Sequence, residues 1–558
     1  SCFKGGGENG LMSRKDNEVS LARSIFNILS GTFCSRITGI FREIAMATYF
    51  GADPIVAAFW LGFRTVFFLR KILGGLILEQ AFIPHFEFLR AQSLDRAAFF
   101  FRRFSRLIKG STIIFTLLIE AVLWVVLQYV EEGTYDMILL TMILLPCGIF
   151  LMMYNVNGAL LHCENKFFGV GLAPVVVNII WIFFVIAARH SDPRERIIGL
   201  SVALVIGFFF EWLITVPGVW KFLLEAKSPP QEHDSVRALL APLSLGILTS
   251  SIFQLNLLSD ICLARYVHEI GPLYLMYSLK IYQLPIHLFG FGVFTVLLPA
   301  ISRCVQREDH ERGLKLMKFV LTLTMSVMII MTAGLLLLAL PGVRVLYEHG
   351  LFPQSAVYAI VRVLRGYGAS IIPMALAPLV SVLFYAQRQY AVPLFIGIGT
   401  ALANIVLSLV LGRWVLKDVS GISYATSITA WVQLYFLWYY SSKRLPMYSK
   451  LLWESIRRSI KVMGTTMLAC MITLGLNILT QTTYVIFLNP LTPLAWPLSS
   501  ITAQAIAFLS ESCIFLAFLF GFAKLLRVED LINLASFEYW RGQRGLLQRQ
   551  HVMQDTQN

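Results

Sequence analysis

The sequence predicts an all-α protein that crosses a membrane many times. Of its 558 residues, 57% are hydrophobic and only 14% are charged, and the mean hydropathy is +0.71. A soluble domain is usually about one quarter charged. Apolar runs of about 20 residues, long enough to cross a bilayer as a helix, recur along the whole chain. The bilayer is therefore the solvent against which the sequence must be interpreted.

Fourteen apolar segments are the predicted helices. They cover residues 22–50, 55–86, 108–129, 136–161, 168–188, 197–223, 237–267, 272–302, 317–341, 355–386, 391–414, 420–441, 458–481 and 499–526. The segments 55–86, 272–302 and 355–386 are longer than a span requires, so we expect them to tilt, bend or extend into water. Gly74 and Gly75 predict a bend in the first of these long segments.

The basic residues indicate how the chain is oriented. Lys and Arg cluster after the segments 55–86, 272–302 and 420–441, whereas most intervening connections are poor in them, the stretch "ARHSDPRER" excepted. The positive-inside rule then places these clusters and both termini in the cytoplasm. Because membrane topology accounts for the net charge of +14, we expect no binding of nucleic acid.

Two halves of the chain resemble each other. Ser35 and Ser250 are 215 positions apart, and so are Pro84 and Pro299, by subtraction of their numbers. This offset predicts two parallel six-helix lobes, related by an axis along the membrane normal, as in many transporters. The predicted parts are a cytoplasmic N-terminal extension (1–20), an N-lobe (21–223), a C-lobe (237–441), two further helices (458–527) and a cytoplasmic tail (528–558).

Cationic side chains inside the apolar segments are the candidate binding residues. They are Arg36, Arg42, Arg64, Arg70 and Lys280. A charge at the bilayer centre costs about 2.5–3.5 kcal/mol on insertion scales. We therefore expect these cations to line a wet cavity between the lobes and to bind an anion, and Arg suits a diphosphate. The alternative is that they tie helices together through backbone carbonyls and the few intramembrane acids.

Supporting roles are predicted for nearby residues. Glu43 is seven positions after Arg36, with Gly39 between them, and is expected to hold Arg36 in the empty cavity. Asp260 and Glu211 are candidate proton or sodium sites, with helix packing as the alternative. The eight cysteines and the isolated histidines show no metal-ligand spacing, so no metal site is expected.

Other function classes fit the residues less well. A membrane glycosyl- or acyltransferase needs a carboxylate pair or a His–Asp arrangement near one membrane face, and the sequence offers no such pattern, so no catalytic residues are expected. A drug/cation antiporter needs an acidic cavity, whereas the intramembrane charges here are mostly basic. A scaffold that transports nothing would have cations fully paired within the protein.

Several motifs resemble one known family. "SRITGIFREIAMATYFGADPIVAAFWLGFR" (35–64), "FLRKI" (68–72), "QAFIPHF" (80–86), "LLP" (297–299) and "LYEHGLF" (346–352) are similar to the MurJ (MviN) family of lipid II flippases. That family belongs to the multidrug/oligosaccharidyl-lipid/polysaccharide exporter superfamily, whose other polyprenyl-diphosphate-oligosaccharide flippases are the alternative. The resemblance covers about residues 20–527.

The resemblance implies a bacterial inner-membrane transporter that serves peptidoglycan synthesis, and so cell-wall biogenesis and cell shape. It implies a V-shaped pair of lobes with a cationic cavity, alternating access, and a groove for the lipid tail at the last two helices. It assigns substrate binding to Arg36, Arg42, Arg64, Arg70 and Lys280. Partners would be lipid II, membrane lipids and the peptidoglycan-synthesis machinery; no cofactor is implied, and sodium, protons, chloride or the membrane potential would supply energy.

The chain departs from the family pattern at four acidic positions. Ala57, Gly75, Leu279 and Gln283 stand where the family often has Asp or Glu. Their absence makes the predicted cavity more positive, and it weakens any ion-coupling scheme that depends on those carboxylates.

Overall fold

The structure is a computed structural model of the chain. It describes residues 35, 37–73, 76–130, 132–164, 166–224, 254–286, 310–387, 389, 391–444, 446–487 and 501–535. These residues form helices and short connections, with no β-strand among them. The predicted all-α class is confirmed. The chain divides into two compact units: unit 1 comprises 1–265, 269–273 and 349–353, and unit 2 comprises the remainder.

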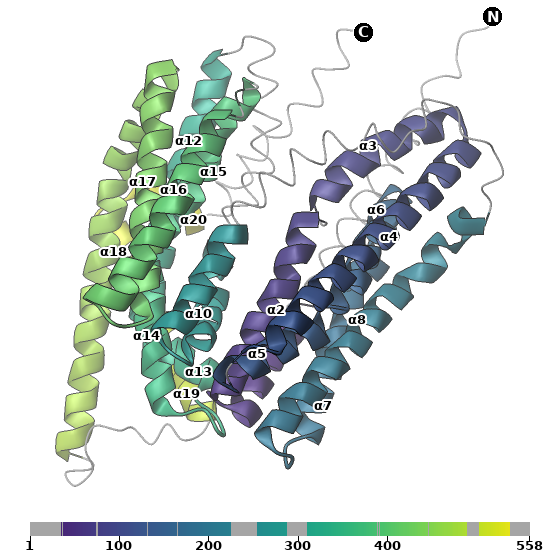
Figure 1. Ribbon diagram of the computed structural model, residues 1–558. Coiled ribbons are helices and arrows are strands. Elements are labelled where there is room, and N and C mark those ends of the chain that lie inside the picture. Colours follow the sequence, from purple (N-terminus) through teal and green to yellow (C-terminus); the bar gives the residue numbers. More distant parts are fainter. Residues whose placement is uncertain are drawn as a thin grey trace, which may run out of the picture. The chain divides into compact units, whose positions relative to one another are not determined.

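Unit 1 begins with a helix at residues 37–50 (Figure 1). The helices that follow are α2 (Pro54–Leu73), α3 (Leu76–Gln92), α4 (Leu94–Leu127), α5 (Glu132–Leu144), α6 (Cys147–Cys163), α7 (Phe167–Ala187) and α8 (Pro193–Leu224). Helix α8 packs against α6 and α7, and α2 packs against α5. Residues 254–265 of a helix at 254–267 also belong to this unit.

Stacked phenylalanines form much of the core of unit 1. Phe82 of α3 packs against Phe100 and Phe104 of α4, with ring centroids 5.8 and 5.3 Å apart, and it stacks on Phe86 of its own helix at 5.3 Å. All four rings are buried, together with most of α6. Aromatic pairs of this geometry contribute about 0.5–1.5 kcal/mol beyond the area they bury. These contacts tie the long helix α4 to the rest of the unit.

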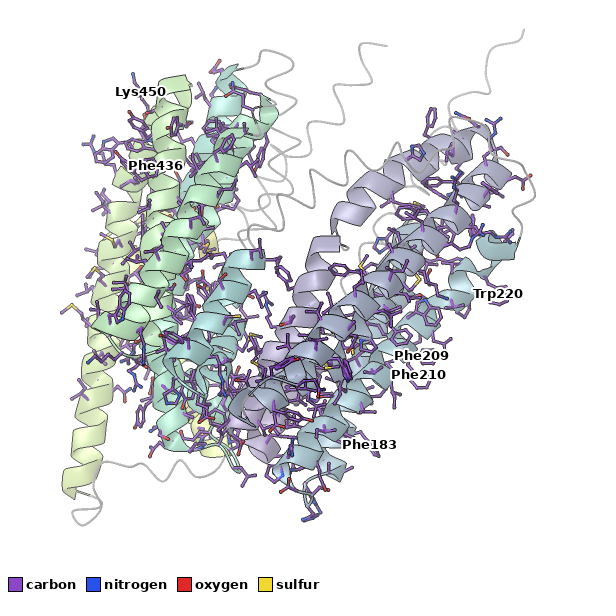
Figure 2. The ribbon with its side chains drawn as sticks, in the orientation of Figure 1. Phe183, Phe209, Phe210, Trp220, Phe436 and Lys450 are labelled. Atoms are coloured by element: carbon purple, nitrogen blue, oxygen red, sulfur yellow. The ribbon has the colours of Figure 1, made fainter. Side chains whose placement is uncertain are left out.

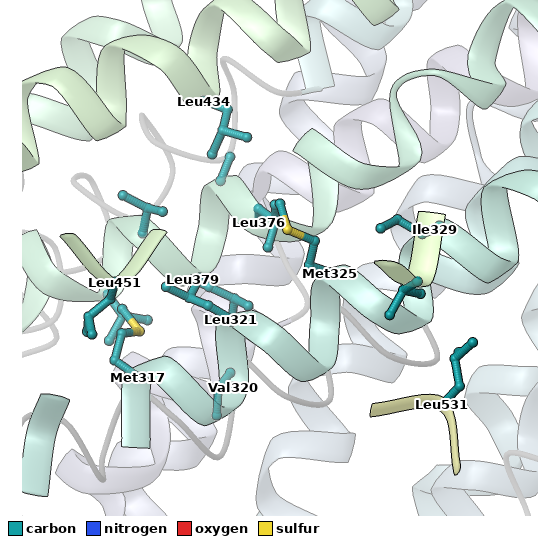
Figure 3. Packing of buried hydrophobic residues seen from close by; sticks show 14 of the residues in the cluster. Met317, Val320, Leu321, Met325, Ile329, Leu376, Leu379, Leu434, Leu451 and Leu531 are labelled. Carbon is teal, nitrogen blue, oxygen red and sulfur yellow. The ribbon is translucent and has the colours of Figure 1, made fainter. Parts of the chain in front are cut away.

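Unit 2 is built from the second set of helices (Figure 1). They are most of α10 (Gly271–Pro285), α12 (His310–Leu337), α13 (Ala339–Tyr347), α14 (Gln354–Gly368), α15 (Ile371–Ala386), α16 (Ala391–Leu409), a π-helix (Val410–Val415), α17 (Ser420–Arg444), α18 (Pro446–Phe487), α19 (Ile501–Leu525) and α20 (Glu529–Ala535). In its core, Met317, Leu321 and Met325 of α12 lie near Leu376 of α15 and Leu451 of α18 (Figure 3).

The outer surfaces of both units are apolar. Phe183 of α7 and Trp220 of α8 project away from the helices of unit 1 (Figure 2), with 74% and 55% of their surfaces exposed. Leu117 and Trp124 of α4 are similarly exposed. Lipid offers no hydrogen-bond partners, so side chains that face it should be apolar and the backbone should be hydrogen-bonded within the helices. The exposed apolar surfaces of both units fit such an environment.

Nine helical stretches among the described residues are long and apolar enough to cross a membrane. They are Leu94–Leu127, Thr134–Cys163, Gly169–Ala187, Pro193–Phe222, Gly313–Leu337, Gln354–Tyr385, Ala391–Val415, Trp453–Ile478 and Gln504–Leu525. Each coincides with one predicted segment. The other five predicted segments contain helix where the structure describes them, so the total of fourteen spans stays a prediction.

The structure corrects the predicted course of several segments. The segment 355–386 is two helices, α14 and α15, and the segment 136–161 is interrupted before α6 at Pro146. The basic clusters expected in connections are instead helical: Arg102, Arg103 and Arg106 lie on α4, and Arg457 lies on α18. Lys and Arg are good helix formers, so these helices continue where hydropathy no longer marks them.

Candidate substrate-binding site

Arg42 is held by three groups in unit 1. Its Nε and Nη2 donate to Glu43 Oε1 at 3.2 and 2.5 Å, and its Nη1 donates to Asn178 Oδ1 of α7 at 2.9 Å. The guanidinium also lies over the ring of Trp181, 4.6 Å from its centroid. Hydrogen bonds to charged groups contribute about 1.5–3 kcal/mol each. The cation is therefore compensated inside a helix that hydropathy predicts to be in the membrane.

Asn178 connects Arg42 to the preceding turn of its own helix. Its Nδ2 donates to the Ser35 carbonyl at 3.1 Å and to Thr38 Oγ1 at 2.9 Å. Gly39 faces the same amide, and a Cβ added there would make an ordinary contact of 3.9 Å with Asn178 Nδ2. One buried amide thus fixes both the helix and the guanidinium that it carries.

Glu43 is predicted to hold Arg36, and among the described residues it binds the adjacent Arg42. Neighbouring residues on a helix point about 100° apart. The long Arg42 side chain nevertheless turns sideways to reach Glu43, which is buried. Arg36 itself lies outside the described residues, so its predicted role stays a prediction.

An aromatic cluster adjoins this network. Trp181 packs edge-to-face against Phe59 at 5.6 Å and against Phe63 at 5.3 Å, and its centroid lies 5.9 Å from that of Trp60. Phe59, Trp60 and Trp181 are almost fully buried. We call Phe59, Trp60, Phe63 and Trp181 the aromatic cluster. It excludes water from one side of Arg42, which strengthens the electrostatic interactions made there.

Arg64 follows this cluster on α2. It lies next to Phe63 and about one turn after Trp60. Its Nη2 is buried and has no hydrogen-bond partner, and within the described part of the chain Arg64 forms no ion pair. Trp181 Nε1 is likewise a buried donor with no acceptor among the described residues. Buried donors are nearly always satisfied, so both call for an acceptor that the described residues do not supply.

Lys280 lies on α10 in unit 2. Its Nζ is 5.3 Å from the centroid of Tyr277, and that ring stacks on Tyr347 at 4.4 Å. The adjacent Ser278 donates to the carbonyl of Ile360 at 3.0 Å and so fixes α10 against α14. Lys280 is therefore a cation with an aromatic support, as Arg42 is in unit 1.

The remaining predicted site residues are distributed as follows. Asp260 and Glu211 are both buried, as ion binding and helix packing both require. Arg70 lies on α2, but its side chain is outside the described part, as are Gly74 and Gly75.

Sequence reasoning did not assign a binding role to Asn178 or Trp181. A relevant pattern was present: Asn178 has a counterpart in Asn404 of the second half. In unit 2, Asn404 is buried and accepts a hydrogen bond from Thr429 at 3.2 Å. A polar residue recurring at one place in two apolar repeats indicates a specific hydrogen bond, although it does not identify the partner.

The chain is similar to known proteins over most of its length. A family model described as lipid II flippase MurJ matches residues 46–494. A probable lipid II flippase MurJ of Chlamydia trachomatis serovar D is 62% identical over 534 residues, which cover 96% of this chain and 99% of the relative. That of Chlamydia muridarum is 62% identical over 533 residues, with the same coverage.

Solved structures share the fold. A lipid II flippase MurJ in an inward closed conformation has a TM-score of 0.65 at 23% identity, covering 89% of this chain and 99% of that one. An inward-facing multidrug-resistance transporter of the MATE family has a TM-score of 0.59 at 15% identity, covering 76% and 99%. With the family model spanning most of the sequence, the chain belongs to the MurJ family of lipid II flippases.

Proposed function

We propose that this chain is a lipid II flippase. It moves the undecaprenyl-diphosphate-linked peptidoglycan precursor from the cytoplasmic to the periplasmic leaflet of the bacterial inner membrane. The chain is a transporter and not an enzyme, since flipping moves the lipid without forming or breaking a covalent bond. Membership of the family and the nine apolar spans support this function.

The unsatisfied donors in unit 1 are the observation that carries the proposal. Arg64 Nη2 and Trp181 Nε1 are buried without acceptors in the described part of the chain, and the ring of Trp181 also supports the guanidinium of Arg42. A diphosphate offers several anionic oxygens, and Arg binds such oxygens with parallel hydrogen bonds. A cationic drug would offer positive charge and no acceptors at this place.

Arg42 changes partners in the mechanism that we propose. Without substrate it is held by Glu43 and Asn178. When the diphosphate arrives, a phosphate oxygen takes over from Glu43, while Asn178 keeps the guanidinium oriented. Arg64 binds the same ligand, and Arg36, Arg70 and Lys280 are proposed to contribute further positive charge.

The transport cycle that we propose is alternating access. The polyprenyl tail stays in lipid along α18 and α19, while the sugar–peptide headgroup crosses within the protein. Sodium, protons, chloride or the membrane potential reset the cycle, and Asp260 and Glu211 are the proposed ion-binding carboxylates. Both termini are proposed to lie in the cytoplasm.

Depletion and rescue in cells test the function. When the resident flippase is depleted, lipid II should accumulate in the inner leaflet, and this chain should restore its export. Variants Lys280→Ala and Arg36→Ala should fail to rescue. Arg103→Ala, which removes an exposed cation on α4, should rescue fully. Rescue by all three variants would contradict the proposed binding residues, and no rescue by the unaltered chain would contradict the function.

A further inference from the structure

A cleft of about 340 Å³ opens in unit 2 among α12, α18 and α20. Its walls combine cations, hydroxyls and apolar side chains. The lining residues are Lys315, Lys318, Phe319, Thr322, Leu323, Ser326, Arg458 and Asp530. None of them belongs to the candidate substrate-binding site. The cleft lies at the end of α12 and α18 that is rich in Lys and Arg.

On the side of the cleft formed by α12, one of the two hydroxyl groups lacks a hydrogen-bond partner among the described residues. Lys315, Lys318, Thr322 and Ser326 follow one another at intervals of three or four residues, so they share one face of α12. Thr322 is hydrogen-bonded to Ser455 of α18 at 3.1 Å. Ser326 is 1% exposed, and its Oγ has no partner within the described residues. A buried hydroxyl without a hydrogen-bond partner destabilises the protein by about 1–3 kcal/mol. Helix packing alone does not offset this cost.

Positive charge exceeds negative charge around the opening. Lys315 pairs with Glu311 at 2.6 Å, and Lys318 pairs with Glu454. Arg458 forms no ion pair with any described residue, and the same holds for Arg457 and for Lys461 on the same helix. The exposed Arg458 guanidinium is thus available at the mouth, where Asp530 supplies a hydrogen-bond acceptor.

We propose that this cleft binds the headgroup of an anionic phospholipid of the surrounding membrane. Arg458 and Lys318 contact the phosphate, and Ser326 and Thr322 donate hydrogen bonds to its oxygens. Asp530 accepts from headgroup hydroxyls, such as those of glycerol. Phe319 and Leu323 pack against the first carbons of the lipid. Basic pockets between membrane helices on the cytoplasmic side bind such headgroups in general. This lipid is a resident ligand and is not the transported substrate.

Binding of phosphatidylglycerol to the purified full chain tests the proposal. The protein is titrated with phosphatidylglycerol or phosphatidylcholine, and retained lipid is counted by native mass spectrometry. We expect phosphatidylglycerol to bind at least tenfold more tightly than phosphatidylcholine. Arg458→Gln should weaken phosphatidylglycerol binding about tenfold. Arg457→Gln is the matched control, because it removes an exposed cation one position away that does not line the cleft.

Two further variants separate the site from general charge effects. Ser326→Ala should weaken binding without changing the net charge, and its thermal midpoint without lipid reports whether the protein is folded. Equal losses for Arg457→Gln and Arg458→Gln would overturn the proposal, as would equal binding of phosphatidylcholine. Inorganic phosphate is the remaining probe: if it stabilises the protein as much as phosphatidylglycerol and displaces it, the site takes free phosphate and the assignment to a lipid is wrong.

Discussion

At the residue scale, Arg42 and Arg64 are cations in the same unit with different surroundings. Arg42 has a carboxylate, an amide and an indole ring around its guanidinium. Arg64 has a buried nitrogen and no carboxylate among the described residues. An unpaired buried cation destabilises a protein, and such groups persist where function requires them. Arg64 should therefore show a conflict between stability and activity.

Replacing Arg64 tests this conflict. Arg64→Met keeps the bulk of the side chain and removes the charge, so we expect the thermal midpoint to rise by about 2–4 °C for each kcal/mol gained. Lipid II export should fall at least tenfold. Arg64→Lys, which keeps the charge but loses the planar fork, should retain part of the activity. Full export by Arg64→Met would exclude a direct role in binding.

Asn178 should affect transport indirectly, because it orients the guanidinium of Arg42. Asn178→Ala removes hydrogen bonds to Arg42, Ser35 and Thr38, which should cost about 1–3 kcal/mol of stability. Asn404→Ala removes the corresponding amide of unit 2 and serves as the control for stability. We expect both to lower the thermal midpoint, and only Asn178→Ala to weaken lipid II binding in a purified-protein assay. Equal binding by both variants would mean that Asn178 is purely structural.

The sequence predicted the cations better than it predicted their partners. An Arg inside an apolar run is recognisable because its insertion cost is large. Asn178 is 136 positions from Arg42. A single sequence does not reveal which distant residue forms a hydrogen bond with a given side chain. The sideways reach of Arg42 to Glu43 was also missed, because helical periodicity describes Cβ directions and not the path of a long, flexible side chain.

At the scale of elements, two glycines shape the end of the helix at 37–50. Gly51 and Gly350 have φ of +65° and +59°, a region that L side chains rarely adopt. They bring two chain segments of unit 1 together, since Leu351 N donates to the Thr48 carbonyl at 2.9 Å. A Cβ on Gly350 would lie 2.1 Å from that same oxygen. Backbone contact, and not a side chain, fixes this junction.

Alanine substitution should break the junction. Gly350→Ala combines left-handed strain of about 1–2 kcal/mol with a collision against the backbone, so we expect it to lower the thermal midpoint strongly and reduce the amount of folded protein in the membrane. Gly397→Ala on α16 is the control, because nothing lies within 4 Å of its added Cβ. It should be neutral or stabilise the helix by about 0.5–1 kcal/mol. Equal midpoints for the two variants would refute the interpretation.

Helix lengths show where hydropathy stops being informative. The predicted segment 458–481 lies inside α18, which runs from Pro446 to Phe487, and the segment 108–129 corresponds to α4, which begins at Leu94. The polar extensions carry no apolar run, so the sequence marked only the parts in contact with lipid. Conversely, the segment 355–386 is apolar enough overall to be predicted as one span, despite Arg362 and Arg365, and its hydropathy does not mark the turn at 369–370 between α14 and α15.

At the scale of the whole molecule, the class of fold followed from composition, whereas orientation rests on the distribution of charge. The basic clusters on α4, α12 and α18 are helical extensions of membrane segments, so they hold Lys and Arg at a fixed height beside the bilayer. Cationic side chains there favour the cytoplasmic side. The turn between α7 and α8 carries Arg189, and Arg194 lies in the first turn of α8. The predicted order of spans, with the N-terminus in the cytoplasm, would nevertheless place this turn in the periplasm.

Cysteine accessibility in cells decides between these opposing indications. Gln92 and Ser191 are exposed and lie at the end of α3 and in the turn before α8. In a background without other cysteines, Ser191→Cys should react with a membrane-impermeant maleimide in intact cells whose outer membrane has been opened. Gln92→Cys should react only after the inner membrane is permeabilised. An Arg194→Gln change should leave this pattern unaltered, because that residue is paired with Asp136 at 2.7 Å and contributes little free charge. Labelling of Gln92→Cys from outside would reverse the orientation, and would place the lipid-headgroup cleft in the periplasmic leaflet.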